Sequence, residues 1–244
     1  RFNIELFIIR HAESANNSLS DNRNRITDPP ITELGKRQSE ILAKHLATGA
    51  TQDLVPGAAP GSARAQERKG YGITSLYCSP MLRSLQTAYP IKEATGLLPK
   101  VWVDIHESGG MFLDHGDERG SVGYPGMTRS EILANYPDYQ LAPGITEDGW
   151  WNRDREDLAN ASGRAIRVAE QLVEMSETED RVAMISHGLF INILFKALLD
   201  QLPGNHIYYR HNNTAISRIS IQKGSTTEVI SLNRLDHLPS DMVS

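Results

Sequence analysis

The 244-residue sequence has one cysteine, no excess of positive charge and no long apolar run. Cys78 cannot form an internal disulfide, and it stands in an apolar stretch that predicts a buried thiol. With 25 Lys and Arg against 30 Asp and Glu, the chain has no basic field for a nucleic-acid backbone or an acidic membrane surface. No run approaches the roughly 18 apolar residues that cross a bilayer. Any anion must therefore be bound by local groups.

The length and composition predict one compact domain over residues 1–244. The first residues contain no apolar core typical of a signal peptide, which favours a cytoplasmic protein. Because the sequence starts at Arg1 rather than Met, a removed leader stays open as an alternative.

Four short apolar segments predict the strands of a central sheet, at residues 4–9, 73–78, 100–103 and 181–186. A helical pattern or a long connection follows each one, which is typical of α/β proteins with a mainly parallel sheet and helices on both faces, a three-layer α/β/α arrangement. Two last strands, at 215–221 and 228–232, predict a hairpin. The carboxyl ends of neighbouring parallel strands line one crevice.

Helical periodicity predicts four longer helices. One starts at Thr32, and one follows Ser79, a predicted N-cap, with Pro90 inside it. The third is expected from Trp150 to Val173, and the fourth, at 189–199, is apolar on nearly all sides and must be buried.

Two glycine-rich segments lack a clear period. Residues 49–70 predict an exposed excursion, with disorder as the alternative, which would cover the crevice or form the interface of a homodimer. Residues 108–149 predict a loop-rich lid with one short helix at 130–136. Long connections of this kind are often functional.

Polar side chains with phosphate chemistry come directly after the predicted strands: Arg10, His11, Arg83, Glu107 and His187. Guanidinium groups bind phosphate oxygens bidentately and stay charged at any working pH. A neutral imidazole is a competent nucleophile for a phosphoryl group, and a carboxylic acid can protonate the departing alkoxide. The set predicts a phosphomonoester site that needs no metal or cofactor.

Four motifs stand in order along the chain. They are Arg-His-Ala-Glu at 10–13 with Asn17, Ile-Thr-Glu-Leu-Gly at 31–35 with Gln38, Cys-Ser-Pro at 78–80 with Arg83 and Gln-Thr-Ala at 86–88, and Ser-His-Gly at 186–188. Asn213 precedes the predicted hairpin. This series resembles the histidine phosphatase superfamily, in its phosphoglycerate mutase-like branch, with Ala12 where the family has glycine.

The resemblance implies that His11 is the phosphorylated nucleophile and that Arg10, Arg83 and His187 form the phosphate pocket, with Asn17 adding a contact. It places the acid at Glu107, and the rivals close to it in sequence are Asp104, Asp117 and Glu118.

Other polar residues of the lid have less definite roles. Arg119 and Arg129 are candidates for binding a second acidic group of the substrate, although exposed arginines often only solubilise. His106, Asp114, His115 and Asp117 lack a recognised metal-ligand spacing, so no metal is predicted.

The sequence thus predicts a metal-independent phosphatase that hydrolyses a small phosphorylated metabolite through a phosphohistidine. A phosphoglycerate mutase is the first alternative, but the mutases' Glu-Arg-His-Tyr-Gly is replaced by Glu-Ser-Gly-Gly-Met at 107–111. A non-catalytic module that binds a phosphorylated ligand is the second alternative.

Overall fold

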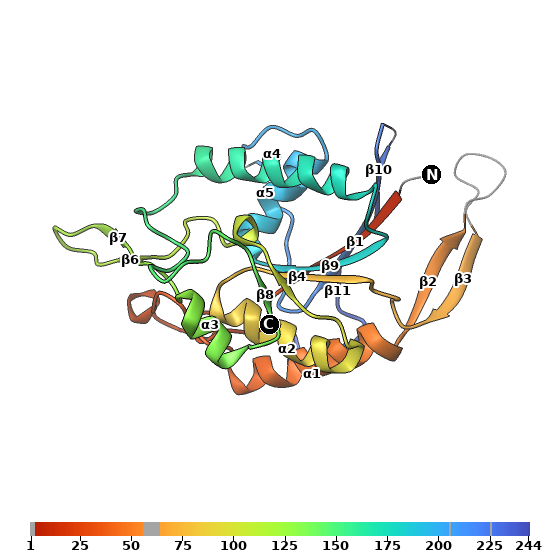
Figure 1. Cartoon of the computed structure of the whole chain (residues 1–244), viewed down its shortest axis with the longest axis horizontal. Coiled ribbons are helices and arrows are strands. Elements are labelled where there is room, and N and C mark those ends of the chain that lie inside the picture. The colour runs from red at the N-terminus through yellow and green to blue at the C-terminus, as the bar shows by residue number, and fades with distance from the viewer. Residues whose placement is uncertain (1–2, 56–63, 205, 225) are drawn as a thin grey trace.

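A seven-stranded sheet forms the centre of the molecule (Figure 1). The computed structural model describes residues 3–55, 64–204, 206–224 and 226–244. The strand order is β11-β10-β1-β9-β4-β5-β8, in which β1, β9, β4, β5 and β8 are parallel and β10 and β11 are antiparallel to their neighbours. The strands are β1 (Asn3–Arg10), β4 (Ser75–Cys78), β5 (Lys100–Val101), β8 (Gln140–Leu141), β9 (Arg181–Ser186), β10 (Ile216–Gln222) and β11 (Thr227–Arg234).

Helices cover both faces of this sheet, which confirms the predicted three-layer α/β fold (Figure 1). On one face lie α1 (Glu33–Thr48), α2 (Leu82–Thr95) and α3 (Arg129–Asn135), and on the other lie α4 (Leu158–Met175) and α5 (Gly188–Leu198). Three 3-10 turns, η1 (Asn22–Asn24), η2 (Val103–Ile105) and η3 (Ser240–Met242), complete the set. In this part of the chain, no helix has both the length and the apolar character needed to cross a membrane.

The apolar run of β1 joins the two layers of the core. Phe7 and Ile9 belong to the core on the α1 and α2 face, and Leu6 and Ile8 to the core on the α4 and α5 face. All four are completely buried, and each contributes about 1.5–3 kcal/mol relative to an exposed position. Because β1 is paired with β10 on one edge and with β9 on the other, the residues that follow it are held in place.

The part of the chain from β9 onward follows the predictions closely. Helix α5 has nine buried residues among its 11, as its all-round apolar character requires. Strands β10 and β11 pair antiparallel as the expected hairpin.

Two predictions about helix starts were wrong. The helix expected from Trp150 begins at Leu158, because Asp157 caps it by accepting a hydrogen bond from Asn160 N, while Trp150 N and Trp151 N bind the carbonyl of Pro125. Ser79 is not the N-cap of α2 either. That position is taken by Met81, which has no capping side chain, because the Ser79 hydroxyl contacts a histidine in the crevice.

The described parts of the two glycine-rich segments contain more regular structure than their sequences suggest. Strands β2 (Ala50–Val55) and β3 (Arg64–Lys69) form an antiparallel hairpin that projects from the body of the molecule (Figure 1), with residues 56–63 outside the described part. The lid contains a second hairpin, β6 (Phe112–Asp114) with β7 (Ser121–Gly123), the expected short helix as α3, and the edge strand β8 of the central sheet. The lid is therefore partly built into the sheet.

Candidate active site

The crevice at the carboxyl ends of the parallel strands brings together the residues that the sequence places after them. Arg10 is the last residue of β1, and His11 follows it. Arg83 lies in the first turn of α2, and His187 stands between β9 and α5. The rings of His11 and His187 have centroids 5.0 Å apart.

The hydrogen bonds of His11 define which ring nitrogen is reactive. Nδ1 lies 2.7 Å from the carbonyl oxygen of Ala12, which only a protonated Nδ1 can satisfy. Nε2 therefore carries the lone pair, and Arg83 Nε donates to it at 3.2 Å. Asn213 Nδ2 donates to the His11 carbonyl at 2.8 Å and fixes the backbone there. The ring presents an unprotonated nitrogen to a guanidinium group.

Both histidines are held in the neutral form. Burial lowers the pKa of His11 well below its ordinary value of 6.5, and the charges of Arg83 and Arg10 lower it further. Burial likewise lowers the pKa of His187, with Arg83 and His11 adding to the effect. Near neutral pH the imidazole of His11 is available as a nucleophile.

Among the described residues, two buried nitrogens beside this imidazole have no hydrogen-bond partner. Arg10 Nη1 donates to the carbonyl of His211 at 2.7 Å, but within the described part of the chain Arg10 Nε is buried without a hydrogen-bond partner. His187 Nε2 lies 2.6 Å from Ser79 Oγ, and its Nδ1 is likewise buried and unpaired. An unpaired buried donor such as Arg10 Nε is costly, and phosphate oxygens are acceptors that suit it.

Asn17 lies at the edge of this group. Its Oδ1 accepts hydrogen bonds from Ser14 N at 3.0 Å and Ser14 Oγ at 2.9 Å, and Asn213 Nδ2 lies 3.3 Å away. The side-chain oxygen is thus used to hold the loop after His11. Only its amide nitrogen is left to contact a ligand.

Glu107 is the one carboxylate among the four sequence candidates that reaches the cavity with Arg83, a space of about 300 Å³. Its Oε1 accepts hydrogen bonds from Ser108 N at 2.8 Å and from Phe190 N, in the first turn of α5, at 2.9 Å. Asp104 does not line that cavity, Asp117 forms a surface ion pair with Arg119, and Glu118 is exposed.

A buried ion pair supports the segment that carries Glu107. Arg164 of α4 binds both carboxylate oxygens of Glu156, at 3.0 and 2.6 Å, and donates to the carbonyls of Asp104 and His106 at 2.6 and 3.0 Å. Both side chains are about 98–99% buried. Neither residue stood out in the sequence, because only the fold buries both of them.

Arg164→Met is expected to lower the free energy of unfolding by about 3–5 kcal/mol, because it leaves the Glu156 carboxylate buried without its main partner. Urea unfolding measures the change. Arg167→Met, an exposed arginine on the same helix, is the control and should stay within about 0.5 kcal/mol of the parent. If Arg164→Met lowered the free energy of unfolding no more than the control does, this ion pair would not stabilise the fold.

Asp28 is a second residue that sequence reasoning missed. Its Oδ1 accepts a hydrogen bond from Leu82 N at 3.0 Å and lies 3.8 Å from Arg83 Nη1. Burial raises its pKa to about 6, against the opposing effect of Arg83. The charged form of Asp28 therefore destabilises the fold while it balances the charge of Arg83.

Asp28→Asn is expected to raise the free energy of unfolding at pH 7.5 by about 1–3 kcal/mol, from 1.36 kcal/mol per pKa unit. A carboxyl group whose pKa is raised on folding favours the folded state fully below its unfolded pKa, and that contribution is lost as the pH rises through about 6. The stabilisation by Asn should therefore vanish near pH 4. Urea unfolding at both pH values tests this, and an equal difference at the two values would contradict it.

The two lid arginines proposed from the sequence lie elsewhere. Arg119 is exposed and forms a bidentate pair with Asp117, and Arg129 Nη1 faces the carbonyls of Ala142 and Ile145 at 3.4 Å. Neither lines the cavity beside Glu107, whose wall instead includes Arg25 and Arg155.

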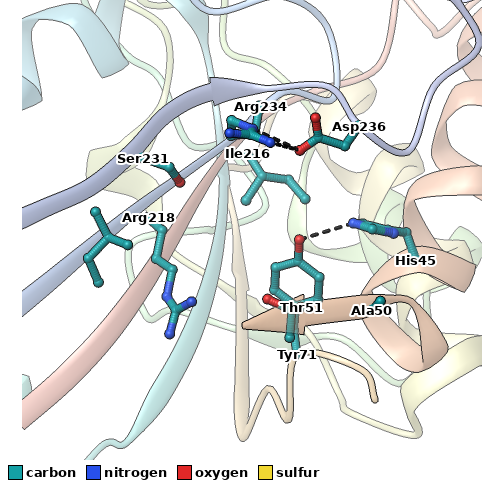
Figure 2. Close-up of a pocket in the computed structure, with 10 residues that line it drawn as sticks. His45, Ala50, Thr51, Tyr71, Ile216, Arg218, Ser231, Arg234 and Asp236 are labelled. Carbon is teal, nitrogen blue, oxygen red and sulfur yellow. Dashed lines mark hydrogen bonds and ion pairs between the residues drawn. The ribbon is translucent and has the colours of Figure 1, made fainter. Parts of the chain in front are cut away.

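A larger cavity of about 470 Å³ lies between the end of α1, the base of the β2–β3 hairpin and β10–β11 (Figure 2). Its polar side chains face one another. Tyr71 Oη lies 3.0 Å from His45 Nε2, and Arg234 Nη2 lies 2.7 Å from Asp236 Oδ2. None of the predicted site residues lines it. The crevice at His11, where Arg10, Arg83 and His187 meet, is the candidate active site.

Comparison with known proteins agrees with this fold. The family model of the histidine phosphatase superfamily (branch 1) matches residues 57–234. Phosphoserine phosphatase 1 of Hydrogenobacter thermophilus is 24% identical over 239 residues, covering 96% of this chain and 94% of its own. A "Probable phosphoglycerate mutase" of Yersinia enterocolitica is 22% identical over 222 residues, covering 90% and 86%. The solved phosphoserine phosphatase of Entamoeba histolytica, in complex with 3-phosphoglyceric acid, superposes with a TM-score of 0.58 at 18% identity, covering 97% and 100%.

Proposed function

The chain belongs to the histidine phosphatase superfamily (branch 1), and we propose that it hydrolyses a small phosphomonoester through a phosphohistidine on His11. The observation that carries the proposal is the state of His11. Its Nε2 is unprotonated, buried and 3.2 Å from the guanidinium of Arg83. A nucleophile and a charge-stabilising cation therefore meet at one point, as phosphoryl transfer requires.

In the first step, His11 Nε2 attacks phosphorus and the bond from phosphorus to the alcohol oxygen breaks. Arg10, Arg83 and His187 bind the phosphoryl oxygens, and Asn17 contributes its amide. Glu107 gives its proton to the departing oxygen. In the second step, Glu107 takes a proton from water, water oxygen bonds to phosphorus, and the bond to Nε2 breaks. Inorganic phosphate leaves and His11 is restored, so no metal or cofactor is needed.

The size of the cavity supports a small substrate. About 300 Å³ lies at the lower end of the range for ligand pockets. The names of the relatives make O-phosphoserine and 3-phosphoglycerate the first compounds to test.

Phosphorus NMR with 3-phosphoglycerate and O-phosphoserine, in the presence of a chelator, tests the proposal. Inorganic phosphate is the expected product. Conversion of 3-phosphoglycerate into 2-phosphoglycerate would instead establish a mutase, the activity in the name of the Yersinia relative. Binding of both compounds without any product would establish a non-catalytic module.

A further inference from the structure

The cavity next to the phosphate pocket is lined by more arginines than carboxylates. Its charged lining residues are Arg23, Arg25, Arg83, Arg155, Glu107 and Asp114. This surplus of arginine occurs in a chain with a net charge of −5. Arg23 forms an ion pair with Asp21 at 2.7 Å, and Arg83 donates a hydrogen bond to His11 Nε2.

Arg25 directly follows η1 and lines the cavity together with Arg83. Among the described residues, its guanidinium forms no ion pair and no hydrogen bond. Burial lowers the pKa of Arg83, and the positive charge of Arg25 is among the groups that lower it further. Arg25 therefore lies close enough to act on an anion bound beside Arg83.

Arg155 lies on another wall of the same cavity. Its guanidinium carbon is 4.7 Å from the centroid of the Phe112 ring, which also lines the cavity. This stacking holds the plane of the guanidinium while its N–H edge stays available. In the part of the chain that the structure describes, Arg155 has no acidic partner within ion-pair distance.

The two acids on the wall do not neutralise these arginines. Glu107 is bound by backbone N–H groups of Ser108 and Phe190, and Asp114 Oδ1 accepts a hydrogen bond from Gly116 N at 3.1 Å. Two cations thus remain beyond those that hold the transferred phosphoryl group.

We propose that Arg25 and Arg155 form a subsite for a second anionic group of the substrate, a carboxylate or a second phosphate, in the cavity that they share with Arg83. The inference rests on the proposed function for the orientation of the substrate, with its phosphoryl group at His11. The subsite selects phosphomonoesters that carry two anionic groups over those with one.

Binding to the His11→Ala variant tests the subsite without turnover. Titration calorimetry compares 3-phosphoglycerate with glycerol 3-phosphate, which has a hydroxymethyl group in place of the carboxylate. Fructose 1,6-bisphosphate and fructose 6-phosphate form the second pair. The member with the additional anion is expected to bind at least about tenfold more tightly in one pair or both, which also identifies the anion.

Adding Arg25→Gln or Arg155→Gln should reduce that preference about fivefold or more, and leave the affinity for the singly anionic member within about twofold. The matched control is Arg119→Gln, because Arg119 is an exposed arginine outside the cavity. It should change neither the preference nor the affinity for the singly anionic member. Equal binding within both pairs, no binding of any probe, or a preference unchanged in both glutamine variants would overturn the subsite. A clear preference in a protein whose parent form releases no phosphate would instead overturn the proposed hydrolysis.

Discussion

His11→Ala is expected to lower kcat for phosphomonoester hydrolysis by at least about 10⁴-fold, because the reaction loses its nucleophile. The remaining groups still bind phosphate oxygens, so KM should change much less than kcat. Release of inorganic phosphate from p-nitrophenyl phosphate, in the presence of a chelator, measures the effect. His115→Ala is the control, since that ring contacts Tyr124 Oη at 3.1 Å and does not line the cavity beside Glu107.

The same variant also tests the covalent intermediate. Rapid alkaline quenching of the parent enzyme with labelled substrate should trap an acid-labile phosphoramidate on the protein, and His11→Ala should trap none. Retention of more than about a tenth of the parent kcat by the variant would place the nucleophile elsewhere. It would leave the geometry around Nε2 without a catalytic role.

Glu107→Gln is expected to lower kcat/KM for an alkyl phosphate such as O-phosphoserine by about 10²–10⁴-fold, the usual contribution of general acid catalysis. An alkoxide cannot depart without a proton, whereas p-nitrophenolate departs as a stable anion. The loss with p-nitrophenyl phosphate should therefore be at least about tenfold smaller. Steady-state kcat/KM reports the first chemical step, in which the leaving group is protonated.

Glu118→Gln is the matched control for this substitution, because Glu118 is an exposed lid carboxylate. It should leave kcat/KM unchanged for both substrates. Equal losses for the two substrates in Glu107→Gln would mean that Glu107 positions the site rather than donates the proton. If Glu118→Gln lowered kcat/KM as much as Glu107→Gln, Glu118 in the lid would be the general acid instead.

Local sequence was sufficient for the elements and residues that follow directly from a buried strand. The apolar run before Arg10 and His11 can only be buried, and a strand buried on both faces delivers the next residues to one edge of the sheet. The same reasoning applies to His187 after β9. Arg10, Arg83 and His187 meet although they are far apart in the chain, because parallel strands end at the same edge of the sheet.

Helix starts and loops were predicted less well, because tertiary contacts compete with local signals there. Ser79 has the sequence signature of an N-cap, yet its hydroxyl lies 2.6 Å from His187 Nε2. The hydrophobic periodicity of the lid is weak. Its two-residue strand β8 forms by pairing with β5 at the edge of the sheet. Such pairing energy comes from the partner strand and leaves no mark on the segment itself.

The sequence by itself determined the α/β class, the polar residues that follow each strand and the family resemblance. These depend on hydrophobic periodicity and on the residues next to strand ends. Only the tertiary structure decided which charges meet. Asp28 beside Arg83 and Arg25 in the same cavity as Arg155 are pairs from distant segments, and the burial of Glu156 with Arg164 is likewise set by the fold. A charged side chain on a loop looks alike in sequence whether it faces solvent or a site, and its electrostatic effect depends on distance and burial, which exist only in the folded chain.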